Sequence, residues 1–216
     1  EKQDAISDNN IFDVFSNVNA SVCIATYTGL NRFENNLAKF ITKSIYENGS
    51  LLSINYFLEM NDGNVLIGTE SGIKVFNTND ESIRDFKTFF KSKENYFESL
   101  YIYSFYLDTD SCLWVGTRDS GLYIYDIKSD KVIDVSEELD IKKLNHAVVR
   151  EMVCDEFGNF WVATNVGLCC INLKDNSYVF YNHDKKDKKS IPHDDIFDLM
   201  LSDDLLYVTT GDGLAV

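Results

Sequence analysis

Short apolar runs recur along the chain, and each ends in a threonine that is soon followed by a glycine. Clear copies are VLIGTESGI from Val65, LWVGTRDSGL from Leu113 and FWVATNVGL from Phe160. Runs rich in β-branched and aromatic residues and bounded by Gly, Asn and Asp predict strands rather than helices. The pattern occurs five times, and the threonines stand 43, 48, 47 and 46 residues apart. They are Thr26, Thr69, Thr117, Thr164 and Thr210.

Each copy predicts four strands. A first strand such as Ile196–Met200 lies upstream of turn-forming residues such as Asp155–Asn159, which suit a hairpin. The threonine strand follows, and the glycine then starts a third strand such as Gly121–Tyr125. We expect the outermost fourth strands at 37–40, 83–86, 131–135 and 176–181.

Four antiparallel strands that repeat at this period are typical of β-propeller blades. A blade cannot bury its two apolar faces alone, so neighbouring blades must stack on it. We assign the column of Trp114 and Trp161, shared with Cys23, Leu66 and Tyr207, to the contact between blades. The sequence therefore predicts an all-β fold, a single propeller segment over residues 1–216. Its blade units are expected at about 8–46, 51–90, 99–138, 146–186 and 193–216.

The fifth unit stops at Val216, inside its third strand. We therefore expect about four complete blades plus a partial fifth, and a place in a larger ring, most simply one of seven blades. The remaining blades of a parent propeller, or a second copy of the chain, are the expected partners of the outer faces.

Composition narrows the function classes. With 44% hydrophobic and 13% aromatic residues the chain is that of a folded protein, and its net charge of −15 disfavours nucleic acid and anionic membrane surfaces as partners. No apolar run approaches the ~18 residues that span a bilayer. The five cysteines lack metal-binding spacing, so we expect buried thiols, no metal and no cofactor.

The stretch from Asp155 to Leu168, DEFGNFWVATNVGL, resembles the two-component regulator propeller repeat, whose signature is D-x-x-G-x-L-W-I-G-T-x-x-G-L. Cys23 and Leu66 depart from it where Trp is usual, as does Thr209 where Gly or Ala is usual. The resemblance implies an extracytoplasmic sensor region of a bacterial receptor whose output is a histidine kinase or diguanylate cyclase. It also implies a small-molecule or oligosaccharide ligand, but the motif assigns no binding residue.

Candidate ligand-binding residues lie in loops. In a propeller, the loops that enter first strands and the loops that join second to third strands open on the same side. His146 and His193 precede first strands, so we expect them near Arg118, Asp119 and Asp212. Three interpretations of these residues remain open: a catalytic histidine site, part of a ligand-binding rim, or ordinary solvated loop residues.

A second candidate set recurs inside the first strands, where it is expected to line a central channel. Its three carboxylates suggest a cation site. However, carboxylates in a water-filled channel are stable without a cation, and calcium-binding loops place their oxygen ligands closer together in the sequence. The set is Asp13, Tyr56, Ser104, Glu151 and Asp198.

No phosphate-binding glycine loop or nucleophile elbow is present in the sequence, so no catalytic residue is predicted. The sequence favours a ligand-sensing segment of an extracytoplasmic receptor. The alternatives are a protein-interaction scaffold and a propeller lyase or glycosidase-like enzyme.

Overall fold

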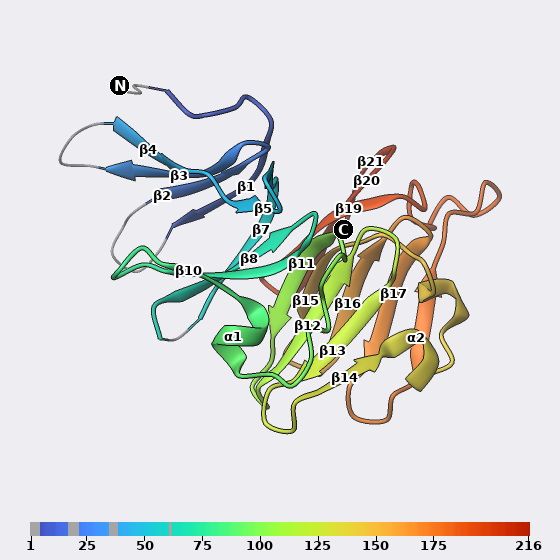
Figure 1. The fold of residues 1–216 in the computed structure, drawn as a ribbon. Coiled ribbons are helices and arrows are strands. Elements are labelled where there is room, and N and C mark those ends of the chain that lie inside the picture. Colours follow the sequence, from blue (N-terminus) through green and yellow to red (C-terminus); the bar gives the residue numbers. More distant parts are fainter. Residues whose placement is uncertain (1–4, 17–21, 35–38, 61) are drawn as a thin grey trace. The chain divides into compact units, whose positions relative to one another are not determined.

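A computed structural model describes residues 5–16, 22–34, 39–60 and 62–216 (Figure 1). The chain divides into two compact units, Glu1–Ile102 (unit 1) and Tyr103–Val216 (unit 2).

Unit 1 contains two four-stranded antiparallel sheets, ordered β1-β2-β3-β4 and β7-β8-β9-β10. The first sheet consists of β1 (Ile11–Ser16), β2 (Val22–Thr26), β3 (Gly29–Glu34) and β4 (Lys39–Lys43). The second consists of β7 (Ile54–Glu59), β8 (Asn64–Thr69), β9 (Gly72–Asn77) and β10 (Ile83–Asp85). A small hairpin of β5 (Tyr46–Glu47) and β6 (Ser50–Leu51) joins them, and α1 (Phe86–Phe90) follows β10.

Unit 2 holds three successive sheets of the same kind (Figure 1). The first consists of β11 (Ile102–Leu107), β12 (Cys112–Thr117), β13 (Leu122–Asp126) and β14 (Lys131–Asp134). The second consists of β15 (Val149–Cys154), β16 (Asn159–Thr164), β17 (Gly167–Asn172) and β18 (Tyr178–Tyr181). The third consists of β19 (Ile196–Ser202), β20 (Leu205–Thr210) and β21 (Gly213–Ala215). The short helices α2 (Val135–Glu138) and η1 (Lys142–Leu144) precede β15.

The all-β propeller fold and its four-stranded antiparallel blades are confirmed. The sequence predicted no helices, whereas α1, α2 and η1 occupy the connections after β10 and β14. Asp134 shows why one of them forms, because its carboxylate accepts hydrogen bonds from the backbone N–H groups of Ser136 and Glu137. Of the strand and turn residues expected from the sequence, Leu37, Ala38 and Asn61 lie outside the described residues.

Neighbouring blades bury their apolar faces against each other within each unit. In unit 1, Cys23 and Ala25 of β2 share one cluster with Ile54, Phe57 and Ile67 of the next blade. In unit 2, Trp114 of β12 shares a cluster with Phe160 and Val162 of β16. The core is therefore a series of blade contacts, because each sheet is apolar on both faces.

A recurring hydrogen bond closes the turn between the second and third strand of every blade. The threonine hydroxyl donates to the carbonyl of the glycine that starts the third strand, at distances from 2.5 to 2.9 Å. Thr164, for example, is fully buried and bonds to Gly167. We call this contact the Thr–Gly latch. Its members are the pairs Thr26–Gly29, Thr69–Gly72, Thr117–Gly121, Thr164–Gly167 and Thr210–Gly213.

Candidate functional site

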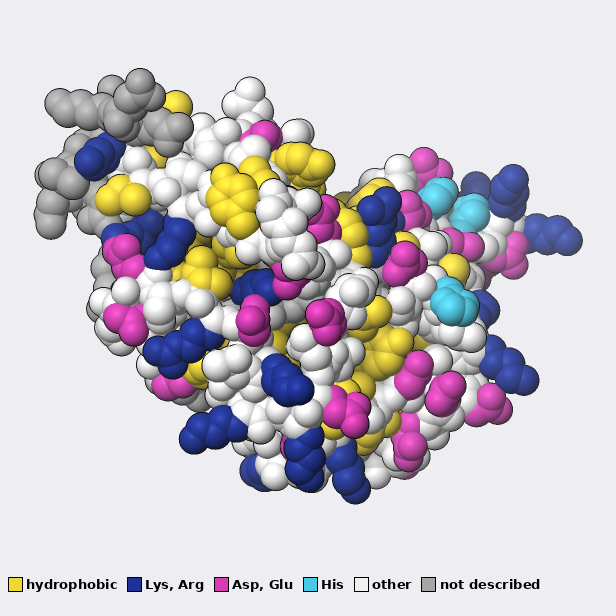
Figure 2. Space-filling model, in the orientation of Figure 1, with side chains coloured by type: hydrophobic (Ala, Val, Ile, Leu, Met, Phe, Trp, Pro, Cys, Tyr) yellow, Lys and Arg dark blue, Asp and Glu magenta, His cyan; other side chains and the backbone are white. Residues whose placement is uncertain are grey.

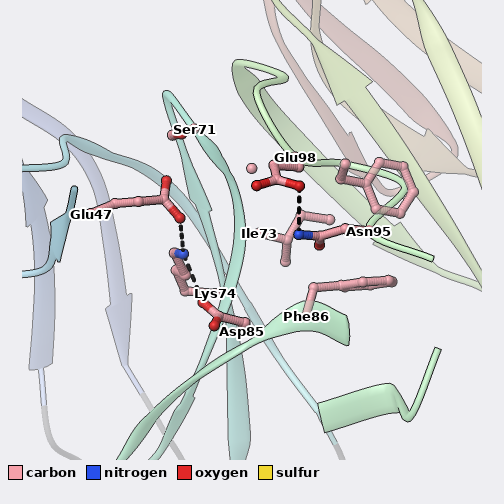
Figure 3. A pocket seen from close by; sticks show the side chains of 10 residues that line it. Glu47, Ser71, Ile73, Lys74, Asp85, Phe86, Asn95 and Glu98 are labelled. Carbon is pink, nitrogen blue, oxygen red and sulfur yellow. Dashed lines mark hydrogen bonds and ion pairs between the residues drawn. The ribbon is translucent and has the colours of Figure 1, made fainter. Parts of the chain in front are cut away.

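A polar pocket of about 120 Å³ lies on unit 1 (Figure 3). Its residues come from β5, from the β8–β9 turn and β9, from the end of β10 and the start of α1, and from the connection that leads to β11. The β8–β9 turn joins a second to a third strand, and the connections of this lining lead into the first strands β7 and β11. Part of the lining therefore comes from the kinds of loop in which the sequence predicts ligand-binding residues. Its lining comprises Glu47, Ser71, Gly72, Ile73, Lys74, Asp85, Phe86, Asn95, Phe97 and Glu98.

Lys74 is the central charged group of this pocket. Its side chain is only 9% exposed, and its ammonium donates to a carboxylate oxygen of Glu47 at 2.7 Å and of Asp85 at 2.8 Å (Figure 3). An ammonium has three N–H donors. The described residues accept two of them, which leaves one N–H for an acceptor oxygen in the pocket.

The opposite wall carries further polar groups. The side-chain amide of Asn95 donates to Glu98 at 2.8 Å, and Ile73 lies between this pair and Lys74 (Figure 3). Two buried rings, Phe86 and Phe97, meet edge to face at 5.1 Å between centroids. The pocket thus offers donors and acceptors beside apolar surface, the combination that fixes the orientation of a small ligand.

Hydrogen bonds between Lys74 and its carboxylate partners favour the charged forms of Lys74 and Glu47. Burial alone would lower the pKa of Lys74, but the hydrogen bonds to Asp85 and Glu47 outweigh burial and raise it. The hydrogen bond from Lys74, followed by one from Ser71, lowers the pKa of Glu47. Both partners therefore remain ionised at neutral pH.

The loop residues predicted from the sequence form two separate groups in unit 2. His146 has positive φ, and its Nδ1 lies 3.2 Å from the carbonyl oxygen of Asp119. Nδ1 of His193 accepts the backbone N–H of Asp195 at 2.9 Å. Figure 2 shows that histidine side chains gather on one end of unit 2, among acidic and basic groups. No hydrogen bond between the two histidines occurs in the part of the chain that the structure describes.

The turn after β20 packs against His193. A Cβ added to Gly211 would lie 2.9 Å from Nδ1 of His193, and the following residue, Asp212, is exposed. Arg118 is also exposed, in the β12–β13 turn. The structure therefore brings His146 to Asp119 and His193 to the turn that contains Asp212.

The first-strand column is built around β-bulges. The pairing register shifts beside Asp13, Tyr56, Glu151 and Asp198, and each of the three acids accepts the backbone N–H of the next residue at 2.7 to 2.8 Å. A bulge leaves backbone groups without a strand partner, and a carboxylate satisfies one of them. The second carboxylate oxygen of Asp13 accepts the N–H of Phe57 in the next blade.

Ser104, the remaining member of the column, is fully buried and donates to the carbonyl of Val149 in the next blade at 3.3 Å. Among the described residues, no three His, Cys, Asp or Glu side chains are grouped as a metal site would require.

Sequence reasoning did not single out two charged residues that the structure shows to be paired, Lys74 and Arg150. Lys74 carried a signal, because a lysine in the middle of the apolar strand GIKVFN must be either paired or functional. Arg150 carried none. It donates to Asp195 at 2.6 Å and to the carbonyl of Ile196 at 2.8 Å, and it lies 4.8 Å from the ring centroid of Phe197, all in the next blade.

The family model described as "Two component regulator propeller" matches residues 96–119, which run from the connection after α1 through β11 and β12. Residues 96–119 match one two component regulator propeller repeat. The repeat supplies the threonine of a Thr–Gly latch, Thr117, and the inter-blade Trp114. The resemblance seen in the sequence is confirmed. None of the curated proteins matches the chain.

Solved structures share the fold. The extracellular domain of BT3049 from B. thetaiotaomicron, assigned as a hybrid two component system, has a TM-score of 0.72 at 18% identity. That of BT4673 from the same organism, assigned as a one component system, has a TM-score of 0.77 at 14% identity. The match covers 99% of this chain and 28% of each of theirs.

Virginiamycin B lyase from Staphylococcus aureus has a TM-score of 0.66 at 10% identity, over 96% of this chain and 65% of its own. At these identities the likeness shows the propeller fold alone. The chain spans about a quarter of the two extracellular domains. No helix among the described residues combines the length and apolar character of a membrane span.

Proposed function

We propose that this chain is a ligand-sensing part of the extracytoplasmic region of a bacterial membrane signalling receptor. The observation that carries the proposal is the agreement between the repeat matched at 96–119 and a fold shared, over 99% of the chain, with two extracellular domains assigned to signalling systems. In this proposal residues 1–216 form one propeller segment of a seven-bladed ring, completed by further blades or by a second copy.

The ligand is a small molecule or an oligosaccharide, and the polar pocket of unit 1 is its proposed site. The third N–H of Lys74 meets a ligand oxygen, while Glu98 and Asn95 meet hydroxyl or amine groups. The loop residues Arg118, Asp119, His146, His193 and Asp212 are proposed as further ligand-binding residues, in the two groups that they form in unit 2. The segment performs no catalysis and contacts neither nucleic acid nor membrane.

Signalling requires a ligand with different affinity for two receptor states. Lys74 ties the connection before β7, through Glu47, to the end of β10, through Asp85. A ligand that binds Lys74 therefore changes the ion pairs that join the connection before β7 to the end of β10. The output domain responds to that change through the spacing of two receptor copies.

The test is a thermal-shift screen of this chain against oligosaccharides and small metabolites, repeated with Lys74→Met. A matched control is Lys128→Met, which removes an exposed lysine of unit 2. A sensor gains melting temperature with a ligand of the panel, and Lys74→Met but not Lys128→Met removes the gain. Conversion of a panel compound into product would show an enzyme instead. No ligand but a co-purifying protein would show a scaffold.

A further inference from the structure

The two tryptophans of the chain occupy equivalent positions but different surroundings. Trp114 and Trp161 each stand three residues before a latch threonine. Trp114 is 5% exposed, because the ring of Phe160 in the next blade lies 4.3 Å from it between centroids. Trp161 is only partly buried, and the residue of the next blade that corresponds to Phe160 is Leu206. Leucine covers less of an indole than phenylalanine does.

One cavity beside Trp161 has a volume of about 310 Å³. It lies between the β15–β16 hairpin and the β19–β20 hairpin, at the end of these blades opposite to the loops that enter the first strands. Trp161, Phe157, Leu201 and Leu206 provide apolar surface. The ring of Phe157 is 63% exposed and so is accessible to a ligand in the cavity.

The charged groups of this cavity are all acidic. Asp155, Glu156, Asp203 and Asp204 line it, and no lysine or arginine does so among the described residues. Asp155 is a structural member, because its carboxylate accepts the Nε1–H of Trp161 at 3.2 Å and the N–H groups of Phe157 and Asn159. Burial alone would raise the pKa of Asp155, but the hydrogen bonds from Asn159 outweigh burial and lower it.

The other three acids are exposed on the two hairpins. An indole face in a cavity with uncompensated carboxylates attracts positive charge in two ways, through the ring quadrupole and through direct Coulomb interaction. The net charge of −15 adds a long-range field of the same sign. An anion or a neutral ligand gains from neither.

We propose that this cavity binds a small organic cation, an ammonium or guanidinium compound with an apolar body. The cationic group lies against the indole of Trp161 between Glu156, Asp203 and Asp204, and the apolar part contacts Phe157 and Leu206. The inference extends the sensing role proposed above, on which its biological meaning rests, to a second site with its own ligand class.

The two indoles make a direct assay available. The chain has only two tryptophans, so a ¹⁵N-labelled sample gives two indole N–H signals, which Trp161→Phe assigns. The probes are choline, phenethylamine and agmatine. We expect at least one of them to shift the Trp161 signal saturably while the Trp114 signal stays in place. The neutral isostere of choline, 3,3-dimethylbutan-1-ol, is expected to bind at least 10-fold more weakly.

Variants separate the two contributions. Asp203→Asn with Asp204→Asn removes two charges, and asparagine keeps the positive φ that both residues adopt. We expect the affinity for the cation to fall at least 10-fold. The matched control is Asp110→Asn, an exposed acid in the corresponding hairpin two blades earlier, which is expected to leave affinity unchanged. Leu206→Phe reproduces the cover over Trp114 and is expected to abolish binding with no change of charge.

Three results would overturn the inference: no shift of the Trp161 signal with any probe, equal binding of the neutral alcohol, or affinity unaffected by both the asparagine pair and Leu206→Phe. If the probes fail while another compound stabilises the chain through Lys74, this inference fails and the sensing function stands. If no compound binds either site, both proposals fail.

Discussion

The indole of Trp114 lies 4.3 Å from the ring of Phe160, centroid to centroid and tilted by 38°, with the two rings in successive blades. Nε1 of the indole donates to Asp108 at 3.1 Å, in the hairpin of its own blade. One side chain thus satisfies its polar atom within its blade and buries its apolar surface against the next. Trp161 repeats the bond to the hairpin, through Asp155, but its aromatic neighbour, Tyr181 at 5.8 Å between centroids, lies in its own blade and not in the next.

Trp114→Ala is therefore expected to destabilise the protein strongly. Removal of a buried aromatic ring leaves a cavity and costs about 3–5 kcal/mol. Trp161→Ala should cost distinctly less, because Trp161 is less buried. Urea unfolding followed by circular dichroism measures both free energies of unfolding. Equal decreases in the free energy of unfolding would contradict the conclusion that Trp114 is more buried than Trp161.

Removal of one hydroxyl tests the Thr–Gly latch. Thr164→Val keeps the side-chain shape but removes the hydroxyl that donates to the carbonyl of Gly167 and accepts the N–H of Val166, at an expected cost of about 1–2 kcal/mol. Thr209→Val is the matched control. Thr209 is exposed on β20, in the next blade, and its hydroxyl makes only a long contact of 3.4 Å to the carbonyl oxygen of Asp198. Its stability should change by less than about 0.5 kcal/mol. A loss at both sites of the same size would show that the latch contributes nothing particular.

The Lys74 cluster predicts a pH dependence. Because Lys74 lowers the pKa of Glu47 in the folded state, the contribution of Glu47 to stability is present above its ordinary value of 4.5. It is lost as the pH falls through the lowered folded-state pKa. The stability difference between wild type and Lys74→Met should therefore be largest near neutral pH and narrow below about pH 4.5.

The control for this experiment is Arg84→Met, which removes an exposed ion pair to Asp80 at 3.6 Å. Such a pair contributes about 0–1 kcal/mol, so little change in stability is expected. Chemical denaturation at a series of pH values gives all three curves. A pH-independent gap for Lys74→Met would disprove the coupling to Glu47.

Gly116 leaves no room for a Cβ between its own blade and the next. A Cβ at this position would lie 2.2 Å from the hydroxyl oxygen of Ser104 and 2.9 Å from the carbonyl oxygen of Val149. Gly116→Ala is expected to destabilise by about 1–3 kcal/mol or more through overpacking. Gly68→Ala, at the same position of another blade, should cost less, because its Cβ would meet a side-chain methyl of Ile102 at 3.0 Å. Thermal unfolding ranks the two variants, and the reverse order would refute the argument.

The two buried cysteines, Cys23 and Cys169, are expected to resist alkylation. Burial raises the pKa of Cys169 to about 12 and that of Cys23 to about 11, so almost no thiolate exists at pH 8. Iodoacetamide labelling followed by peptide mass spectrometry should find both thiols unmodified in the folded protein and labelled in urea. Rapid labelling of Cys169 in the native state would contradict its burial.

Much of the fold was readable before the structure. The five threonines and the alternation around them predicted four-stranded blades because a latch, a hairpin and an apolar strand are local features that depend on residues close in sequence. The short helices were missed for the opposite reason. α1 and α2 have five and four residues, too few to show the repeating apolar pattern by which a helix is predicted from sequence.

The same distinction between local and long-range features applies to the candidate sites. The sequence by itself determined the blades, their order and the acidic surface, since repeat spacing, turn chemistry and charge are properties of the chain. Only the tertiary structure decided that Lys74 joins Glu47 and Asp85 in a pocket, that His146 and His193 meet different turns, and that Leu206 leaves the indole of Trp161 partly uncovered. Those outcomes depend on which side chains of separate loops and blades come within a few ångströms of each other, and spacing along the chain does not encode that distance.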